Sequence, residues 1–274
     1  MNKLARATIT AKNENQNAWV DMFEKALSAP EYKPRSMIIK ELLNFTLTVD
    51  PLWPFMNFSN RKLNIPYIKK ELLWKLSADP HNDSIKQHAK IWQSTQNSDG
   101  TFNSNYGQYW FGKQLGLQKA FNELVKDKDS RRAIIPMLND SHLGPAVTDT
   151  VCTESVGFFI RDYKLHMIVH MRSSDQIFGL GTDIPTFAFL HRLMIALVNS
   201  LYQSIEFGTL SITAMSSHIY ATHFDMVWKI VEDPSLDIDT MFMPVCDYEE
   251  ALKLITSGGN VKAEWGELSE WLLS

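Results

Sequence analysis

Cys152 is one of two cysteines among 274 residues, and it lies where a polar segment meets an apolar run, in TDTVCTESVGFFIRD. A cysteine acts as a nucleophile when nearby cations lower its pKa and favour the thiolate. Arginines in SRRAII and MRSSD could supply that charge. The structural alternative is a buried cysteine that behaves as a small apolar residue. Cys152 is therefore a candidate nucleophile.

The arginines themselves could bind an anion. Arg131 and Arg132 are adjacent, and Arg172 begins RSSD. A guanidinium group can grip a phosphate with two parallel hydrogen bonds, although adjacent arginines at a strand start are often only solvated. Because the net charge is −4, an anionic ligand would need such a local cluster.

Two carboxylates could take part in proton transfer or base recognition. Glu71 has Tyr67 four residues before it and Trp74 three residues after it, and such aromatic neighbours could raise its pKa. Asp183 precedes IPTF, so its structural alternative is a helix N-cap. A cysteine hydrolase that uses His166, His170 or His218 has no local signature here, but spacing alone leaves it open.

Composition limits the class of protein. With 45% hydrophobic and 21% charged residues, the chain has the profile of a soluble globular protein. Two cysteines cannot build a disulfide framework, and the chain has no C-x-x-C pair, so we expect no metal site. Neither the amino-terminal residues nor FAFLHRLMIALV is long and apolar enough to be a signal peptide or to span a bilayer. We expect an intracellular protein that binds neither nucleic acid nor membrane.

The elements that must position these residues can be predicted from periodicity. Helices are expected within 16–29, 65–78, 112–127, 182–203 and 222–233, and strands within 131–138 and 206–215. Residues 156–172 predict two strands with a turn near Asp162, and residues 36–50 mix both signals. We predict one α+β domain over residues 1–274, a mostly antiparallel sheet packed with helices, with residues 1–14 flexible.

Together these stretches resemble a known family. DSRRAIIPML, VCTESVGFFIRD, MRSSDQIFGLGTD and SSHIYATHFDMV, with ELLWKL and NSNYGQYW, are similar to ordered blocks of the thymidylate synthase superfamily. The similarity covers roughly residues 35–230 and points to the pyrimidine hydroxymethylase branch. It implies a thymidylate synthase-like fold and a homodimer that forms through the sheet and shares its active sites.

The resemblance also implies the reaction. Cys152 matches the nucleophile that adds to C6 of a pyrimidine nucleoside monophosphate, so that C5 can attack the methylene of 5,10-methylenetetrahydrofolate. Glu71 matches the carboxylate that organises water and moves protons. Tyr106 and Trp92 match aromatic residues beside the thiol and the folate, and the reaction would take place in the cytoplasm of a bacterium or a phage-infected cell.

The remaining matches concern binding. Residues that match phosphate ligands are Arg35, Arg131, Arg132, Arg172 and Ser173, of which Arg131 and Arg132 come from the neighbouring subunit. His218 and Tyr220 match the pair that binds the sugar 3′-hydroxyl, and Asp175 and Gly179 match folate and base contacts.

Asp183 matches the position that selects the base. Uracil-using relatives have an asparagine here, whose amide suits O4 and N3–H. A carboxylate can instead accept from the cytosine amino group and share a proton with N3. The aspartate therefore favours dCMP as the substrate.

Three departures from the family pattern concern the outcome. Thr153 suits the hydroxymethylase branch, and Gly157 replaces a glutamine that contacts the nucleotide. The last 40 or so residues diverge, and KAEWGELSEWLLS lacks the tail that closes thymidylate synthase sites against water. We therefore expect water to trap the intermediate and give 5-hydroxymethyl-dCMP. The alternatives are dUMP hydroxymethylation, reductive methylation, or a non-catalytic relative.

We predict that Cys152→Ser binds nucleotide but loses turnover by several orders of magnitude, because a hydroxyl cannot replace the thiolate as covalent catalyst. The variant should also lose exchange of the C5 hydrogen with solvent, measured as tritium release from the labelled nucleotide. Normal exchange would contradict the assignment of Cys152 as nucleophile.

Overall fold

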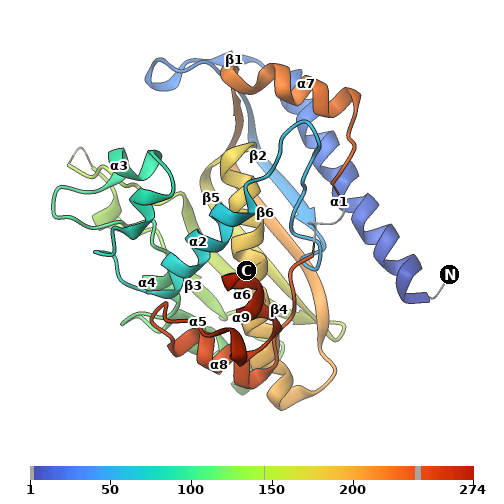
Figure 1. Cartoon of the computed structure of the whole chain (residues 1–274), viewed down its shortest axis with the longest axis vertical. Coiled ribbons are helices and arrows are strands. Elements are labelled where there is room, and N and C mark those ends of the chain that lie inside the picture. The colour runs from blue at the N-terminus through green and yellow to red at the C-terminus, as the bar shows by residue number, and fades with distance from the viewer. Residues whose placement is uncertain (1–2, 145, 238–241) are drawn as a thin grey trace. The chain divides into compact units, whose positions relative to one another are not determined.

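A computed structural model describes residues 3–144, 146–237 and 242–274, with side chains from residue 13 onward. Six strands form one open sheet in the order β1-β2-β6-β5-β4-β3 (Figure 1). They are β1 (Glu31–Tyr32), β2 (Ile39–Val49), β3 (Ile134–Pro136), β4 (Thr153–Arg161), β5 (Lys164–Asp175) and β6 (Glu206–Tyr220). The strand pairs β1–β2, β2–β6 and β3–β4 are antiparallel. The structure thus has the predicted α+β class.

Helices and short 3-10 turns supply the rest of the regular structure. The helices are α1 (Lys3–Leu27), α2 (Ile65–Leu76), α3 (Ile91–Thr95), α4 (Gly107–Trp110), α5 (Gly116–Lys126), α6 (Phe178–Tyr202), α7 (Phe224–Glu232), α8 (Tyr248–Thr256) and α9 (Glu267–Leu273). The 3-10 turns include η1 (Pro34–Ser36), η2 (Ser84–Gln87), η3 (Asp140–His142), η4 (Ala221–His223) and η6 (Ala263–Trp265).

The chain divides into two compact units. Unit 1 comprises Met1–Leu63, Ile168–Ala188 and Phe207–Met243, and unit 2 comprises Asn64–Met167, Phe189–Glu206 and Pro244–Ser274. The single domain expected over residues 1–274 stays a prediction. The flexibility expected of residues 1–14 also stays a prediction, and residues 1–2 lie outside the described part of the chain.

In unit 1, helix α1 packs on β2 and lies beside α7 (Figure 1). Trp19 and Phe23 are buried one helical turn apart, as the predicted helix over 16–29 requires. Their rings meet Phe58 at centroid distances of 6.3 and 6.0 Å. These aromatic contacts fix α1 against the loop that follows β2.

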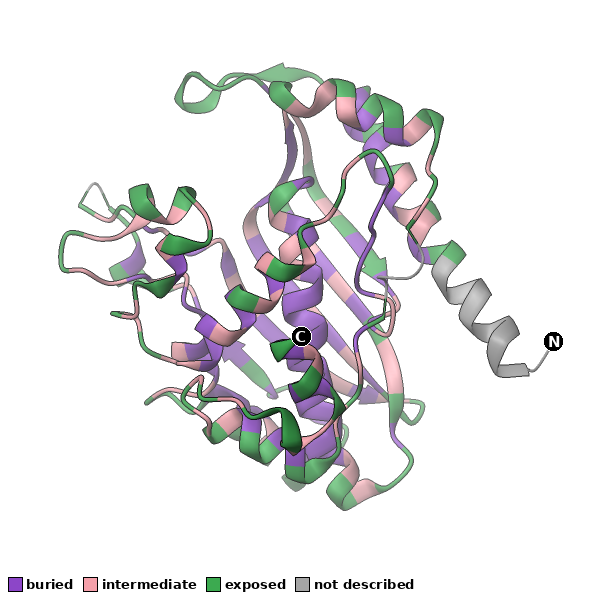
Figure 2. Cartoon of the chain, in the orientation of Figure 1, coloured by how far each residue is buried: buried purple, intermediate pink, exposed green. Residues whose placement is uncertain are grey.

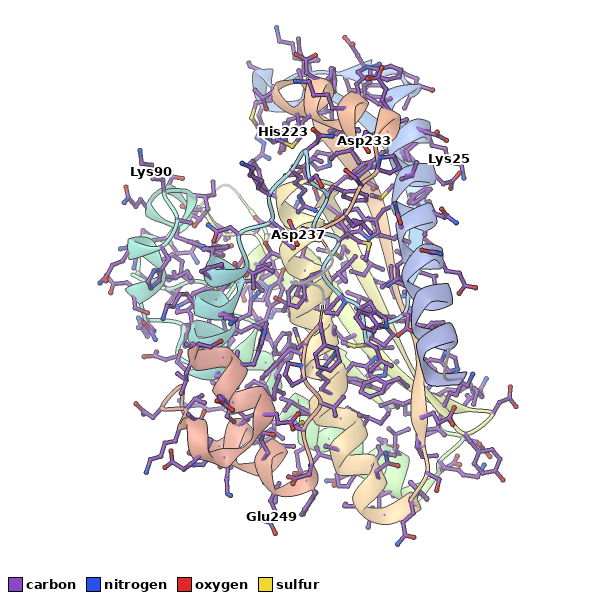
Figure 3. The ribbon with its side chains drawn as sticks, turned by 45° about the vertical axis from the view of Figure 1, so that its right-hand side comes forward. Lys25, Lys90, His223, Asp233, Asp237 and Glu249 are labelled. Carbon is purple, nitrogen blue, oxygen red and sulfur yellow. The ribbon has the colours of Figure 1, made fainter. Side chains whose placement is uncertain are left out.

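The ambiguous stretch 36–50 contains strand β2. It pairs with β6 from Ile39 opposite Tyr220 to Val49 opposite Leu210. β-Branched and aromatic residues suit this pleated surface, and contact with β6 overrides the helical signal. Within the loop that follows β2, the Asn57 carbonyl accepts a hydrogen bond from the Asp237 N–H at 2.9 Å, which joins this loop to the segment after α7. Asp237 is labelled in Figure 3.

The predicted pair of strands over 156–172 is confirmed as β4 and β5. The turn residues Asp162 and Tyr163 have φ angles of 49° and 57°. Two successive positive φ angles are characteristic of the tight turn that matches strand twist. This turn fixes the register of β4, the strand that follows Cys152.

Helix α6 is longer and begins earlier than predicted. It spans 25 residues, is apolar on all sides, and is mostly buried (Figure 2). By length and composition alone it could cross a membrane, but 83% of its most apolar window is buried inside the protein. An all-round apolar helix of this kind is typical of a protein core. Nε2 of its buried His191 lies 2.8 Å from the Leu165 carbonyl oxygen, within hydrogen-bond distance.

Helices α2 and α4 of unit 2 approach so closely that only glycine fits at position 107. A Cβ added to Gly107 would lie 1.5 Å from the backbone oxygen of Lys75. The helix that carries Glu71 and the segment that carries Tyr106 are held together at this point. Gly107 therefore sets the distance between two candidate site residues.

We predict that Gly107→Ala destabilises the protein by about 1–3 kcal/mol or more, because the backbone must move to admit a methyl group. Gly179→Ala is the matched control. Its added Cβ would meet Asp175 Cβ at 3.5 Å, an ordinary contact, and alanine is the better helix former. Urea unfolding of both variants measures the difference. Equal free energies of unfolding would mean that the close approach at Gly107 does not matter.

Candidate active site

The first turn of α6 in unit 1 is capped by Asp175. Its carboxylate accepts hydrogen bonds from the N–H groups of Ile177 and Phe178, at 3.0 and 3.2 Å. The helix begins at Phe178, so Asp183 lies inside it. The reading of Asp183 as a helix cap is therefore wrong. Asp175, and not Asp183, caps this helix.

Asp175, Gly179 and Asp183 are spaced four residues apart. Gly179 and Asp183 lie on α6 and share a face of that helix, whereas Asp175 is the last residue of β5. A Cβ added to Gly179 would lie 3.5 Å from Asp175 Cβ and 3.7 Å from Asp183 Oδ2, which confirms that these three predicted site residues are neighbours. Gly179 leaves space for one more group between the two carboxylates.

Arg61 supports the same turn from the loop after β2. Its guanidinium donates to the Ile177 carbonyl, and its Cζ lies 5.6 Å from the ring centre of Trp19. Burial lowers its pKa to about 10, and the charge of Asp175 opposes that shift. A Cβ at Gly181 would lie 1.5 Å from Arg61 Nη2, so only glycine admits the guanidinium. Nothing in the local sequence pattern marks Arg61, because its partners are distant in the chain.

His218 and Tyr220 meet at the end of β6, as expected. Their rings stand 5.1 Å apart at 89°, and His218 is 6% exposed. His218 Nδ1 lies 3.4 Å from Ser216 Oγ, and that hydroxyl donates to Glu41. Burial lowers the pKa of His218, while the carboxylates of Glu41 and Asp175 act in the opposite direction. The imidazole is therefore neutral near pH 7 and can hydrogen-bond a hydroxyl group.

The candidate phosphate ligands of unit 1 lie on two elements. Arg172 and Ser173 are half-buried on β5. Arg35 is exposed in η1, with a φ angle of 48°. Its charge contributes to the lowered pKa of His218, which places Arg35 in the neighbourhood of that imidazole. The cluster of unit 1 thus combines cations with groups that can bind a hydroxyl group or a base.

Cys152 belongs to unit 2 and directly precedes β4. It is half-buried, and the neighbouring Thr153 is fully buried. Thr153 Oγ1 donates to Tyr106 Oη at 3.1 Å, so the expected proximity of Tyr106 and the thiol strand is confirmed. The preceding loop is held by Asp149, whose carboxylate accepts from the Ser104 N–H at 2.8 Å. Burial raises the pKa of Asp149, against the hydrogen bonds from Ser104.

Glu71 lies on α2 and is paired with Lys75. Lys75 Nζ donates to Glu71 Oε1, and the two side chains are only 3% and 7% exposed. The aromatic neighbours expected of Glu71 contact other groups: Tyr67 binds Trp92, and Trp74 donates to Asn82. The sequence reasoning missed this ion pair, although carboxylate and lysine four residues apart are a recognised signal.

Trp92 lies at the edge of an aromatic cluster in unit 2. Its ring is 5.0 Å from Trp74 and 6.0 Å from Phe102, and its indole N–H donates to Tyr67 Oη at 2.8 Å. Trp92 is partly buried, so one part of the ring is fixed and another is accessible. Such a surface can stack against a planar ligand.

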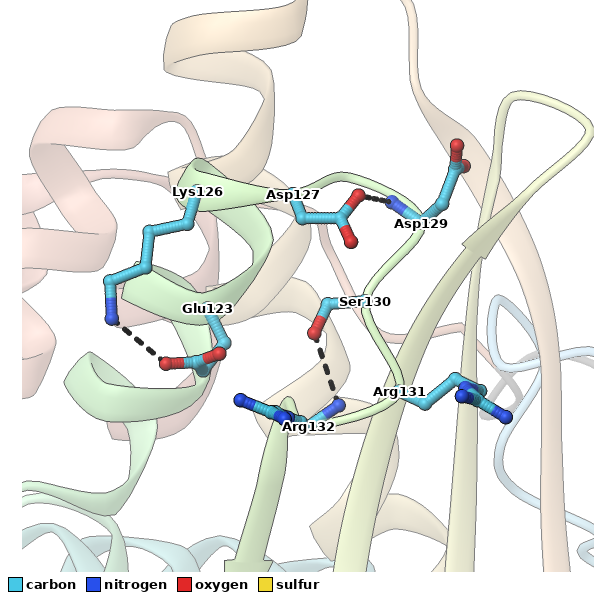
Figure 4. Close-up of a pocket in the computed structure, with 7 residues that line it drawn as sticks. All are labelled: Glu123, Lys126, Asp127, Asp129, Ser130, Arg131 and Arg132. Carbon is cyan, nitrogen blue, oxygen red and sulfur yellow. Dashed lines mark hydrogen bonds and ion pairs between the residues drawn. The ribbon is translucent and has the colours of Figure 1, made fainter.

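Arg131 and Arg132 lie in an open surface pocket (Figure 4). Acidic and polar side chains line it as well: Glu123, Lys126, Asp127, Asp129 and Ser130. The two guanidinium groups are exposed and point to opposite sides. The Arg132 N–H donates to Ser130 Oγ at 3.1 Å, which fixes the backbone. Among the described residues, no group of three or more His, Cys, Asp or Glu could hold a metal ion.

Comparisons with known proteins identify the family. The sequence model of the thymidylate synthase family matches residues 35–250. Deoxycytidylate 5-hydroxymethyltransferases of Enterobacteria phages T4 and T6 are 31% and 32% identical to the chain over 182 residues. These alignments cover 62% of this chain and 74% of each phage protein. The corresponding enzyme of phage T2 is 30% identical over 174 residues, which cover 60% of this chain and 71% of the phage protein. The chain belongs to the thymidylate synthase family.

Proposed function

We propose that this protein transfers a one-carbon unit from 5,10-methylenetetrahydrofolate to C5 of dCMP and that water completes the reaction to give 5-hydroxymethyl-dCMP. The family match makes the protein a one-carbon transferase. The observation that carries the finer proposal is the place of Asp183. Asp183 lies within α6, and its carboxylate is beside Gly179. Asp175, and not Asp183, caps the helix.

Asp183 would recognise the base. A carboxylate accepts from the amino group of cytosine, and a proton shared with N3 completes the pair. Protonation at N3 also withdraws electrons from C6, where the thiolate of Cys152 adds. Uracil would present O4 to the same carboxylate. Because both groups are hydrogen-bond acceptors, no hydrogen bond would form between them. The names of the phage relatives support this choice of base.

The sugar and phosphate would be held by the other residues of unit 1. The neutral imidazole of His218 can donate or accept a hydrogen bond. Together with Tyr220, whose ring lies beside it, it could therefore bind the 3′-hydroxyl of the sugar. Arg172, Ser173 and Arg35 supply charge and hydrogen bonds for the phosphate. The family resemblance implies a second use of such arginine charges, which is to favour the thiolate form of the nucleophile.

The residues present fit a folate. When bound, the folate supplies a methylene carbon at the oxidation state of formaldehyde, which C5 attacks once C6 carries the thiol. Trp92 offers a partly fixed aromatic face, and Gly179 leaves a space beside Asp175. The family resemblance implies that Trp92, Asp175 and Gly179 would each contact the folate. Tyr106 and Glu71 would move protons on the side of the thiol.

The active unit would be a symmetric homodimer that forms through the sheet. On the accessible face of β2 and β6, the hydroxyl groups of Thr46 and Thr213 lie 2.9 Å apart, and Met215 on the same face of β6 is 58% exposed. An exposed face of this composition could pack against a second copy in a symmetric dimer. The exposed Arg131 and Arg132 would then reach the phosphate in the partner's site.

The shared site predicts complementation between two inactive variants. We expect that mixing Arg132→Ala chains with Cys152→Ser chains restores part of the activity, because one site in each mixed dimer has every residue. Activity of unmixed variants is the control. Mixed dimers that form, as shown by tagged co-purification, but stay inactive would contradict the shared site.

The choice of base predicts that Asp183→Asn shifts preference from dCMP toward dUMP. When a buried hydrogen-bonding group of the base faces a protein group that cannot pair with it, binding becomes less favourable by about 2–5 kcal/mol. The ratio of kcat/KM values should therefore change by about thirty-fold to several thousand-fold. The measurement is kcat/KM for both nucleotides in both proteins, with product masses and the oxidation state of the released folate.

The wild-type protein should give 5-hydroxymethyl-dCMP and unoxidised tetrahydrofolate. A methylated product with oxidised folate would show reductive methylation instead, and preference for dUMP would refute the role of Asp183. A product of the expected kind would serve the modification of DNA bases, consistent with the phage origin of the relatives.

A further inference from the structure

Lys75 is a buried cation that the proposed reaction does not yet use. It lies one turn after Glu71 on α2, and its side chain is only 3% exposed. A lysine seldom occupies such a position, because removing an ammonium group from water is costly unless an anion and hydrogen bonds compensate. The anion here is Glu71. An apolar residue would satisfy the packing without this cost, so the charge itself needs an explanation.

The surroundings connect the ion pair to the thiol strand. Lys75 Nζ lies 5.0 Å from the centre of the Tyr106 ring, which adds a cation–π contact. Tyr106 Oη in turn accepts from Thr153, the residue after Cys152. Gly107 allows the backbone of Lys75 to approach α4, so α2 cannot shift freely. Glu71, Lys75, Tyr106 and Thr153 therefore form one connected set within unit 2.

We propose that Lys75 is a positioning residue whose charge holds the carboxylate of Glu71 in the orientation that the water step needs, and so favours a hydroxymethyl product over a methyl product. This inference rests on the proposed function. The ammonium group of Lys75 donates to Oε1 of Glu71. That contact fixes one carboxylate oxygen and directs the other as the group that takes the proton of water.

The step balances as follows. After release of tetrahydrofolate, the nucleotide carries an exocyclic methylene on C5 and the Cys152 sulfur on C6. The oxygen of water forms a bond to the methylene carbon, and the π electrons of that double bond move into the ring. The proton of water goes to Glu71. The ring electrons then form the C5–C6 double bond and expel the thiolate, and no atom is oxidised or reduced.

Four single variants test the role of the charge. Lys75→Met removes it, Lys75→Gln removes it but keeps an N–H donor for Glu71, and Lys75→Arg keeps it. Lys70→Met removes a lysine from the exposed side of the same helix and is the matched control. Each protein is given dCMP tritiated at C5 and methylenetetrahydrofolate. Tritium release reports the steps up to loss of the C5 hydrogen, and 5-hydroxymethyl-dCMP reports the water step.

In Lys75→Met and Lys75→Gln, the ratio of product to tritium release should fall by about a hundred-fold, the usual effect of losing a general base. The intermediate then returns its methylene carbon to tetrahydrofolate and reverts to dCMP, or it takes hydride from tetrahydrofolate, which is oxidised, and gives a methylated product. Lys75→Arg should restore most of the ratio, and Lys70→Met should match the wild type. If Lys75→Met does not fold, the Lys75→Gln variant tests the proposal, because the amide of glutamine can still donate a hydrogen bond to Glu71.

An unchanged ratio in a folded Lys75→Gln would overturn the inference, because a merely structural lysine would lower both signals together. Failure of the proposed function is a separate result and appears in the wild type. A wild-type protein that makes no 5-hydroxymethyl-dCMP would refute that function, and the role of Lys75 with it.

Discussion

The carboxylate of Asp175 determines where α6 begins, and the rest of the unit 1 cluster depends on that start. Two backbone N–H groups donate to it, at Ile177 and Phe178. Moving the start by one residue would rotate every later side chain by about 100° around the helix axis. Asp183 would then no longer face Gly179. A single cap thus controls the direction of the group proposed to read the base.

Sequence patterns predicted much of the fold. Helices α1, α2, α5 and α7 and the turn after β4 follow from local periodicity and turn chemistry. The start of α6 was misplaced because threonine and aspartate before IPTF look like a cap, whereas the actual cap lies eight residues before Asp183. The strand at 36–50 could not be assigned because its partner β6 is far along the chain.

The candidate site was predicted unevenly, and for physical reasons. The family resemblance identified His218 and Tyr220 as site residues, and their rings lie together in the structure. It could not reveal the groups that surround them, because Glu41 lies on β2 and reaches His218 through the hydroxyl group of Ser216 on β6. Arg61 was missed for the same reason. Polar contacts between residues far apart in the chain produce no recognisable sequence pattern. A charged pair four residues apart, such as Glu71 and Lys75, does produce one.

The contact between Arg61 and Gly181 also constrains how this sequence can change over time. A side chain at position 181 and a guanidinium from position 61 cannot occupy the same space, since the added Cβ would lie 1.5 Å from Nη2. Replacing Gly181 first would force the buried arginine out of its place. Replacing Arg61 first opens the space and makes larger residues acceptable at position 181. The order of the two substitutions therefore matters. In descendants of this protein, Arg61 and Gly181 should be replaced together, or Arg61 should be replaced first.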